Sequence, residues 1–361
     1  MKIAVLGGGH GCYAAAADLA EQGHDVAFWR RDKASLAGIM RTGEIILKDA
    51  SGTRAVKLGL VTDDLSAAVS SVALVVIPLP ATAQADLAET LAPHLEDGQV
   101  VFIPPGTFGS LIFARAMKKA GNDAAVSFAE TGTLPYLARK HGEDNVTISV
   151  RATRLPTGIF PASRTDQAFA ILEQAYPAVE RLDDCLSGAL MNAGPIIHPP
   201  LIMMNAGPLE HFDAWDIHNE GTQPSIRSVT DALDAERVAL REALGYGAPH
   251  FPLADYYDDA RPEWMYGNAS HERLTDSGDW REKIDLHTHR YLREDIALGL
   301  VFYVTLGRWA NVDMPVASGL VALASAVTGD DLINGPRSWQ GLGLDGMSHE
   351  DVTKLLHDGK I

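Results

Sequence analysis

Residues 2–23, KIAVLGGGHGCYAAAADLAEQG, decide the fold of the first half of the chain. An apolar run precedes a cluster of glycines and an alanine-rich segment, which predicts a strand, a tight turn and a helix. Gly7 and Gly9 match the dinucleotide fingerprint G-x-G-x-x-G/A, with Cys12 at its third position. Such glycines let the backbone approach a pyrophosphate at a helix N-terminus. The residues predicted to bind a dinucleotide here are Gly7, Gly9, His10, Gly11 and Cys12.

Similar apolar runs recur along the first half, with helical patterns such as 82–98 between them. They lie at 24–32, 71–80, 98–106, 124–131 and 145–154. Strands that alternate with helices predict one parallel, doubly wound sheet covered on both faces, and we expect all of these runs in it.

The pattern changes near residue 185, where long helical segments begin to dominate. They cover 224–247, 289–310 and 315–329. We therefore predict an α/β Rossmann-like domain over residues 1–184, followed by an all-helical domain over residues 185–361.

The residue after the second strand discriminates between NAD and NADP. An acid at this position binds the ribose 2′-OH of NAD, whereas arginine suits the 2′-phosphate of NADP. The sequence FWRRD places Arg30 there, followed by Arg31, so NADP is favoured. If the strand ends later, Asp32 takes this position, so NAD remains an alternative. Pro80 and Gly106 lie in loops after later strands, at the sheet edge where ligands bind, and are further cofactor candidates.

Composition excludes several classes of protein. The 361 residues are 46% hydrophobic and 21% charged, with a formal net charge of −17. Such a charge disfavours nucleic acid and anionic membranes as partners. No apolar run reaches the roughly 18 residues of a membrane span. The two cysteines form no disulfide framework, which suggests the cytoplasm, and His287 and His289 lack a third metal ligand, so no metal is predicted.

The segment 189–210, ALMNAGPIIHPPLIMMNAGPLE, contains one histidine among prolines and apolar residues. A lone histidine in such company is commonly a core residue, but the prolines fix the backbone in a way that suits an aimed side chain. The segment 289–300, HRYLREDIALGL, offers a partner in Asp295. A carboxylate against the imidazole of His198 would fix its tautomer and raise its pKa.

The chain resembles the octopine/nopaline (opine) dehydrogenases over most of its length. Within that family it is most similar to the short bacterial type exemplified by N-(1-carboxyethyl)-norvaline dehydrogenase. The resemblance rests on four stretches, VLGGGHGCYAA (5–15), NAGPIIHPPLIMMNAG (192–207), EGTQPSIRSVTDALDAERVALREALG (220–245) and RYLREDIALGL (290–300). Cys12 and Arg30 depart from the short bacterial type, which has Gly and Asp at these positions.

The resemblance implies a Rossmann domain, a helical domain and an active site in the cleft between them. It makes His198 the proton donor or acceptor, Asp295 its partner and Arg290 the ligand of a substrate carboxylate, while Asn192 matches a family asparagine. The implied reaction condenses an amino acid with a 2-oxo acid and reduces the imine with a nicotinamide.

Two other functions remain open at this point. Reductases of oxo acids to hydroxy acids, such as ketopantoate reductase, share the architecture but usually rely on a lysine of the second domain, and no lysine lies between Lys140 and Lys283. A sensor that binds NADP without catalysis needs no His–Asp pair.

Several segments allow two interpretations each. Thr131, which follows Glu130 at a strand end, is a candidate substrate ligand, and Arg227 is either a second carboxylate ligand or a solvated helix residue. Residues 258–279 suit a lid or a surface excursion, and 296–329 suit a domain core or a homodimer surface.

Overall fold

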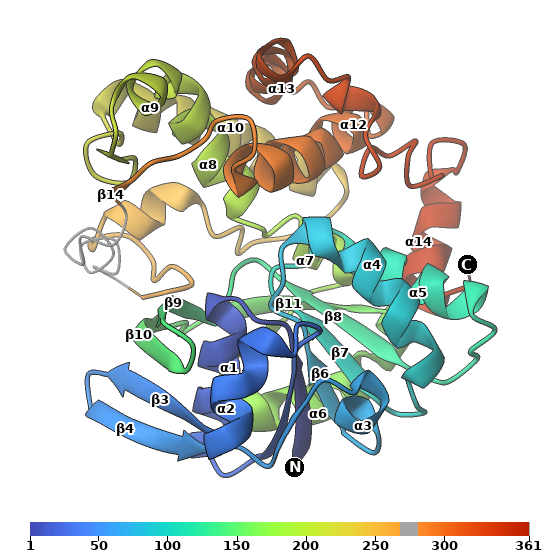
Figure 1. The fold of residues 1–361 in the computed structure, drawn as a ribbon. Coiled ribbons are helices and arrows are strands. Elements are labelled where there is room, and N and C mark those ends of the chain that lie inside the picture. The colour runs from blue at the N-terminus through green and yellow to red at the C-terminus, as the bar shows by residue number, and fades with distance from the viewer. Residues whose placement is uncertain (268–280, 361) are drawn as a thin grey trace. The chain divides into compact units, whose positions relative to one another are not determined.

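The computed structural model describes residues 1–267 and 281–360 and divides into two compact units (Figure 1). The first unit comprises Met1–Ala189 and Lys354–Ile361, and the second comprises Leu190–Thr353. The boundary predicted after residue 184 is too early because the short helix α7 (Cys185–Ala189) packs on strands of the first unit. Most of the candidate lid at 258–279 lies outside the described residues.

The first unit contains an eight-stranded sheet in the order β12-β11-β8-β7-β6-β1-β2-β5. Neighbouring strands are parallel except β8 and β11, which are antiparallel. This confirms the predicted doubly wound architecture. The strands are β1 (Lys2–Leu6), β2 (Asp25–Trp29), β5 (Leu60–Thr62), β6 (Leu74–Val76), β7 (Val100–Ile103), β8 (Ser127–Thr131), β11 (Leu155–Phe160) and β12 (Val179–Arg181).

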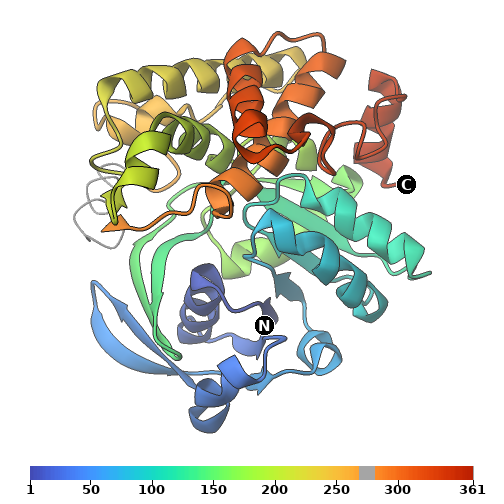
Figure 2. The ribbon, with the colours of Figure 1, turned by 45° about the horizontal axis from the view of Figure 1, so that its top comes forward.

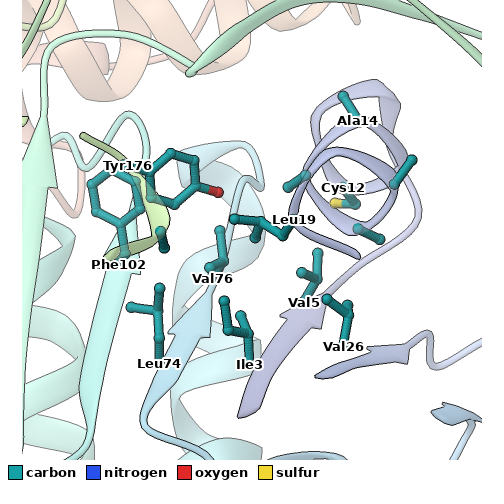
Figure 3. Close-up of a cluster of buried hydrophobic side chains, with 14 of the residues drawn as sticks. Ile3, Val5, Cys12, Ala14, Leu19, Val26, Leu74, Val76, Phe102 and Tyr176 are labelled. Carbon is teal, nitrogen blue, oxygen red and sulfur yellow. The ribbon is translucent and has the colours of Figure 1, made fainter. Parts of the chain in front are cut away.

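Alternation along the central strands builds the core of this sheet. Ile3, Val5, Leu74 and Val76 meet Leu19 of α1 on one face (Figure 3). The helices of the first unit are α1 (His10–Glu21), η1 (Ala34–Leu36), α2 (Ala37–Thr42), α3 (Leu65–Val69), α4 (Ala81–Leu91), η2 (Ala92–His94), α5 (Gly109–Lys119), η3 (Ala162–Arg164), α6 (Thr165–Ala175) and α7.

A second, four-stranded sheet in the order β4-β3-β10-β9 was not predicted. Its strands are β3 (Glu44–Asp49), β4 (Gly52–Lys57), β9 (Tyr136–His141) and β10 (Asn145–Arg151). The prediction that 145–154 extends the main sheet is wrong, because β10 pairs with β3 and β9 instead. Helix α1 packs on β9 as well as on strands of the main sheet (Figure 1). Apolar residues of α1 and of both sheets therefore form one buried cluster.

The second unit is helical, as predicted, apart from a ladder of two residues per strand between β13 (Trp215–Asp216) and β14 (Arg281–Glu282) in the described chain. Figure 2 shows its helices in yellow-green to red. They are α8 (Gly194–Met204), α9 (Ala206–His211), α10 (Pro224–Ala243), η4 (Leu253–Tyr257), η5 (Tyr291–Leu300), α12 (Val301–Trp309), α13 (Pro315–Thr328), η6 (Leu332–Asn334) and α14 (His349–Asp358), which continues into the first unit. The predicted helices at 224–247, 289–310 and 315–329 are confirmed.

Element η5 is a π-helix of ten residues that runs directly into α12. Such helices are rare and often occur at functional sites. It packs closely on α8, because Gly299 leaves no side chain between itself and the ring of Pro195. This close packing brings the middle of α8 against the first turns of η5.

No helix within the described residues has both the length and the apolar character needed to cross a membrane.

Candidate active site

The two segments singled out in the second half meet at one hydrogen bond. Nδ1 of His198, in the middle of α8, lies 2.7 Å from Oδ2 of Asp295 in η5. Both side chains are nearly buried, with 12% and 7% of their surfaces exposed. Gly194 makes the approach possible, because a Cβ atom at this position would overlap Oδ1 of Asp295.

An aromatic cluster holds the imidazole from its other side. The ring of Tyr291 stacks on that of His198, with centroids 3.7 Å apart and planes 10° apart. The Tyr291 hydroxyl lies 2.9 Å from Nε2 of His218, whose ring also meets His198 edge-on. Sequence reasoning assigned no role to Tyr291 or His218. The only signal was the position of Tyr291 beside Arg290 in a motif already quoted.

Burial controls the protonation of the pair. It raises the pKa of Asp295 to about 7, against the opposing charge of Arg290. Burial also lowers the pKa of His198 well below its usual range, and the charge of Arg290 acts in the same direction. The sequence had predicted a raised pKa for this imidazole, whereas its burial acts in the opposite direction. The pair therefore carries one more proton below about pH 7 than above it.

Arg290 lies at the start of η5 with 51% of its side chain exposed. Its nearest carboxylate is that of Glu294, 3.8 Å away, and among the described residues no hydrogen bond is formed by its five N–H donors. Asn192 is buried instead. Its Oδ1 accepts the N–H of Gly194 at 3.0 Å, and its backbone oxygen accepts the hydroxyl of Tyr303. Asn192 thus positions the first turn of α8 rather than presenting an open amide.

The glycine loop of the first unit has the geometry of the fingerprint. Gly7 has a φ of +121°, a region that favours glycine, and the position of a Cβ atom at Gly9 is open. Helix α1 begins at His10, whose Nδ1 accepts the backbone N–H of Lys140 at 2.8 Å.

Cys12 and Gly11 fill the space behind this loop. Burial raises the pKa of the Cys12 thiol to about 12, so this cysteine is a packing residue and not a reactive thiolate. A Cβ atom at Gly11 would lie 3.0 Å from the side chain of Leu134. The first turn of α1 is therefore closely packed at Gly11 and Cys12 but open at Gly9, which fits a pyrophosphate.

Basic side chains gather at the end of β2. Strand β2 ends at Trp29, so Arg30 is the first residue after it, and its guanidinium lies across Gly8. Burial, and after it the positive charge of Arg30, lowers the pKa of Lys140, whose ammonium lies over the ring of Tyr13. Arg31 is exposed beside them, while Asp32 bonds Ser35. Sequence reasoning missed Lys140 because β9 brings it here from another part of the chain.

Comparison with known families covers both halves of the chain. A model described as NAD-dependent glycerol-3-phosphate dehydrogenase N-terminus matches residues 2–106. A model described as NAD/NADP octopine/nopaline dehydrogenase, alpha-helical domain, matches residues 181–328, which include His198 and Asp295. The chain is similar to the octopine/nopaline (opine) dehydrogenases along its helical half and to another family of NAD-dependent dehydrogenases along its first half. It is an NAD(P)-dependent dehydrogenase that acts on the CH–NH group of its donors.

Individual relatives agree with this assignment over the full length. The opine dehydrogenase of Arthrobacter sp. (strain 1C) is 27% identical, with 98% of each chain covered. A solved octopine dehydrogenase in complex with NADH and agmatine has a TM-score of 0.73 at 18% identity, covering 100% of this chain and 98% of its own. A yersinopine dehydrogenase bound to NADP+ has a TM-score of 0.67 at 15% identity, covering 99% and 97%.

Other predicted positions in this chain are structural. Thr131 has no exposed surface, and its hydroxyl donates to the backbone oxygen of Pro156. Contrary to the prediction, it is therefore not available to a substrate. The neighbouring Glu130 accepts the N–H groups of Phe108 and Ser110 at the start of α5. Gly106 must lack a side chain because a Cβ atom would overlap the Glu130 carboxylate.

Pro80 is half-buried and precedes the first turn of α4, at the carboxyl edge of the sheet. The described residues contain no group of three His, Cys, Asp or Glu side chains that could hold a metal ion.

Proposed function

We propose that this dehydrogenase condenses an amino acid with a 2-oxo acid, using His198 and Asp295 as the proton-exchanging pair. The hydrogen bond of 2.7 Å between them, buried beside the half-exposed Arg290, is the observation that carries the proposal. A buried pair with one proton suits a group that must give and take a proton at neutral pH. The partners are small molecules, and the two free thiols suit a reducing cytoplasm.

The chemistry follows from these side chains. Arg290 binds a substrate carboxylate with two parallel N–H donors and so orients the adjacent carbonyl carbon. The amine attacks this carbon, and Nε2 of His198 delivers a proton to the carbonyl oxygen to give a carbinolamine. A second proton, released from the attacking nitrogen, reaches the same oxygen, and the C–O bond breaks to release water and form the imine. The carboxylate of Asp295 holds Nδ1 and fixes the tautomer. The low accessibility of the pair limits hydrolysis of the imine.

The first unit fits a nicotinamide dinucleotide. When bound, that cofactor supplies the hydride that reduces the imine carbon. The open position at Gly9 and the first turn of α1 suit its pyrophosphate. Arg30, Arg31 and Lys140 form a cationic group at the end of β2 in a chain of net charge −17, which favours NADP and its 2′-phosphate over NAD.

The cofactor preference yields a direct test. Arg30→Ser should raise the KM for NADPH by about tenfold or more, because it removes a charge-assisted contact to the 2′-phosphate. The KM for NADH should change by less than about twofold. Steady-state kinetics with both cofactors measures this, and Lys33→Ser is the matched control, since Lys33 is exposed and pairs with Asp63. A wild-type enzyme that prefers NADH would contradict the assignment.

The reaction itself is tested by the absorbance of NADPH at 340 nm. Each 2-oxo acid of a panel, including pyruvate and 2-oxoglutarate, is offered with and without each of a set of amino acids. We expect NADPH consumption only when both are present, and a secondary amine dicarboxylate in the product by mass spectrometry. Consumption without any amine would replace the proposal with a reductase that forms hydroxy acids.

A further inference from the structure

A cavity of about 300 Å³ lies in the second unit between α8, α10 and η4. Helix α10 and the residues after η4 contribute its charged lining residues, and α8 contributes apolar ones. None of His198, Asp295 and Arg290 lines it. The lining residues used below are Ile197, Leu201, Ile226, Arg227, Asp231 and Arg261.

Arg227 presents an unused guanidinium edge to this cavity. Its Cζ atom lies 4.3 Å from the centre of the Tyr257 ring, so one face of the guanidinium is covered. Within residues 1–267 and 281–360 its side-chain N–H groups have no hydrogen-bond acceptor. A planar cation held on an aromatic face, with its edge free, is suited to bidentate binding of a carboxylate.

Asp231 lies one turn further along α10 and lines the same cavity. Opposite charges at this spacing normally pair on a helix. Here the described structure has no ion pair between Arg227 and Asp231, because the arginine is stacked on Tyr257. The cavity thus contains one unpaired cation and one unpaired anion among the described side chains. Arg261, in contrast, is already neutralised by Asp255 and Asp258.

We propose that this cavity is a binding site for a free α-amino acid with an apolar side chain. Arg227 binds its carboxylate, Asp231 accepts its ammonium group, and its side chain lies on Ile197, Leu201 and Ile226. The two fixed charges match a zwitterion, whereas a simple anion or cation would meet one repulsive partner. The biological meaning of the site rests on the proposed function, in which an amino acid is the co-substrate.

The cavity is a neighbour of the reaction centre on α8. Ile197 and Leu201 form one stripe of this helix, while Pro195 and His198 face η5. The two stripes are about a quarter of a turn apart, at the usual 100° per residue. An amino acid in the cavity therefore contacts a different side of α8 from the one that carries the His198–Asp295 bond.

Calorimetric titration of the full chain with L-leucine tests the charge pattern. L-Leucine should bind with one site per chain, and 4-methylpentanoate, which lacks the ammonium group, should bind at least about tenfold more weakly. L-Leucinamide, which lacks the carboxylate, should also bind about tenfold more weakly than L-leucine. Equal binding of all three compounds, or no binding of leucine, would overturn the proposal.

Variants locate the site. Arg227→Gln and Asp231→Asn should each weaken leucine binding by about tenfold, and Tyr257→Leu should do the same by releasing Arg227 to pair with Asp231. Arg308→Gln, on α12 and outside this cavity, is the matched control for loss of a positive charge. Arg290→Gln should leave the affinity for leucine unchanged. If Arg290→Gln lost affinity and Arg227→Gln did not, leucine would bind at the reaction centre and the proposed site in the cavity would be wrong.

The two proposals fail separately. Leucine binding that depends on Arg227, without any amine-dependent NADPH oxidation, would remove the proposed reaction but keep the site. Amine-dependent oxidation with an unchanged KM for the amino acid in Arg227→Gln, together with unchanged leucine affinity, would remove the site but keep the reaction.

Discussion

His198→Asn is expected to lower kcat for the amine-dependent oxidation of NADPH by about 10³-fold. The asparagine amide cannot carry a proton to the carbonyl oxygen, whereas the imidazole, held 2.7 Å from Asp295, can. Binding of NADPH should stay within about twofold of wild type, because the fingerprint loop belongs to the other unit. Steady-state rates and a fluorescence titration with NADPH measure the two effects.

His287→Asn is the matched control for this variant. His287 is exposed and lies in the segment that leads into η5, so its loss should leave kcat near the wild-type value. The melting temperature of each variant shows whether the fold survives the loss of the His198 stack on Tyr291. If His198→Asn fails to fold, His198→Gln keeps more of the side-chain volume. A folded variant with a kcat within about threefold of wild type would exclude this histidine as the proton carrier.

Local signals in the sequence were sufficient for the dinucleotide fold. The fingerprint depends on a strand, a turn and a helix that are contiguous in the chain, so its geometry follows from the residues themselves. The same is true of Arg30, which directly follows β2. Lys140 could not be found in this way, because it reaches the end of β2 only through the pairing of β9 in the second sheet.

The sequence pattern does not specify which strands pair or in which direction a side chain points. An alternating run such as 145–151 predicts a strand but carries no information on its neighbours, and β10 joined the small sheet. Thr131 does lie at a strand end, as predicted, but its hydroxyl turns to the adjacent β11. Ten residues are also too few for apolar periodicity to separate the π-helix η5 from an α-helix.

In the reaction centre, too, the sequence predicted some features and could not predict others. The residues of the pair are 97 positions apart, and their association came from the family resemblance together with the need of an imidazole for a carboxylate. The stack of Tyr291 and the hydrogen bond to His218 depend on how closely α8 and η5 approach. That approach is set by Gly194 and Gly299, whose packing role no single-sequence pattern reveals.

Asp295→Asn should lower kcat by roughly 10²-fold and abolish one step in the pH profile. Burial raises the pKa of Asp295 to about 7, so below pH 7 the pair carries its shared proton and above pH 7 it loses that proton. Condensation needs a proton to be delivered. The wild-type kcat/KM for condensation should therefore fall as the pH rises through about 7, while that for oxidation of the product should rise.

An asparagine at position 295 has no proton to lose in this range, and the burial that lowers the pKa of His198 remains. The step near pH 7 should then disappear in both directions, and the residual rate should be flat from about pH 6 to 8. Rate profiles for both directions, collected at saturating NADPH or NADP+, measure this. Glu294→Gln is the control, since Glu294 lies in the same turn of η5 and its carboxylate is nearest to Arg290. A step near pH 7 that persists in Asp295→Asn would assign the titration to another group and leave the pair without its proposed proton.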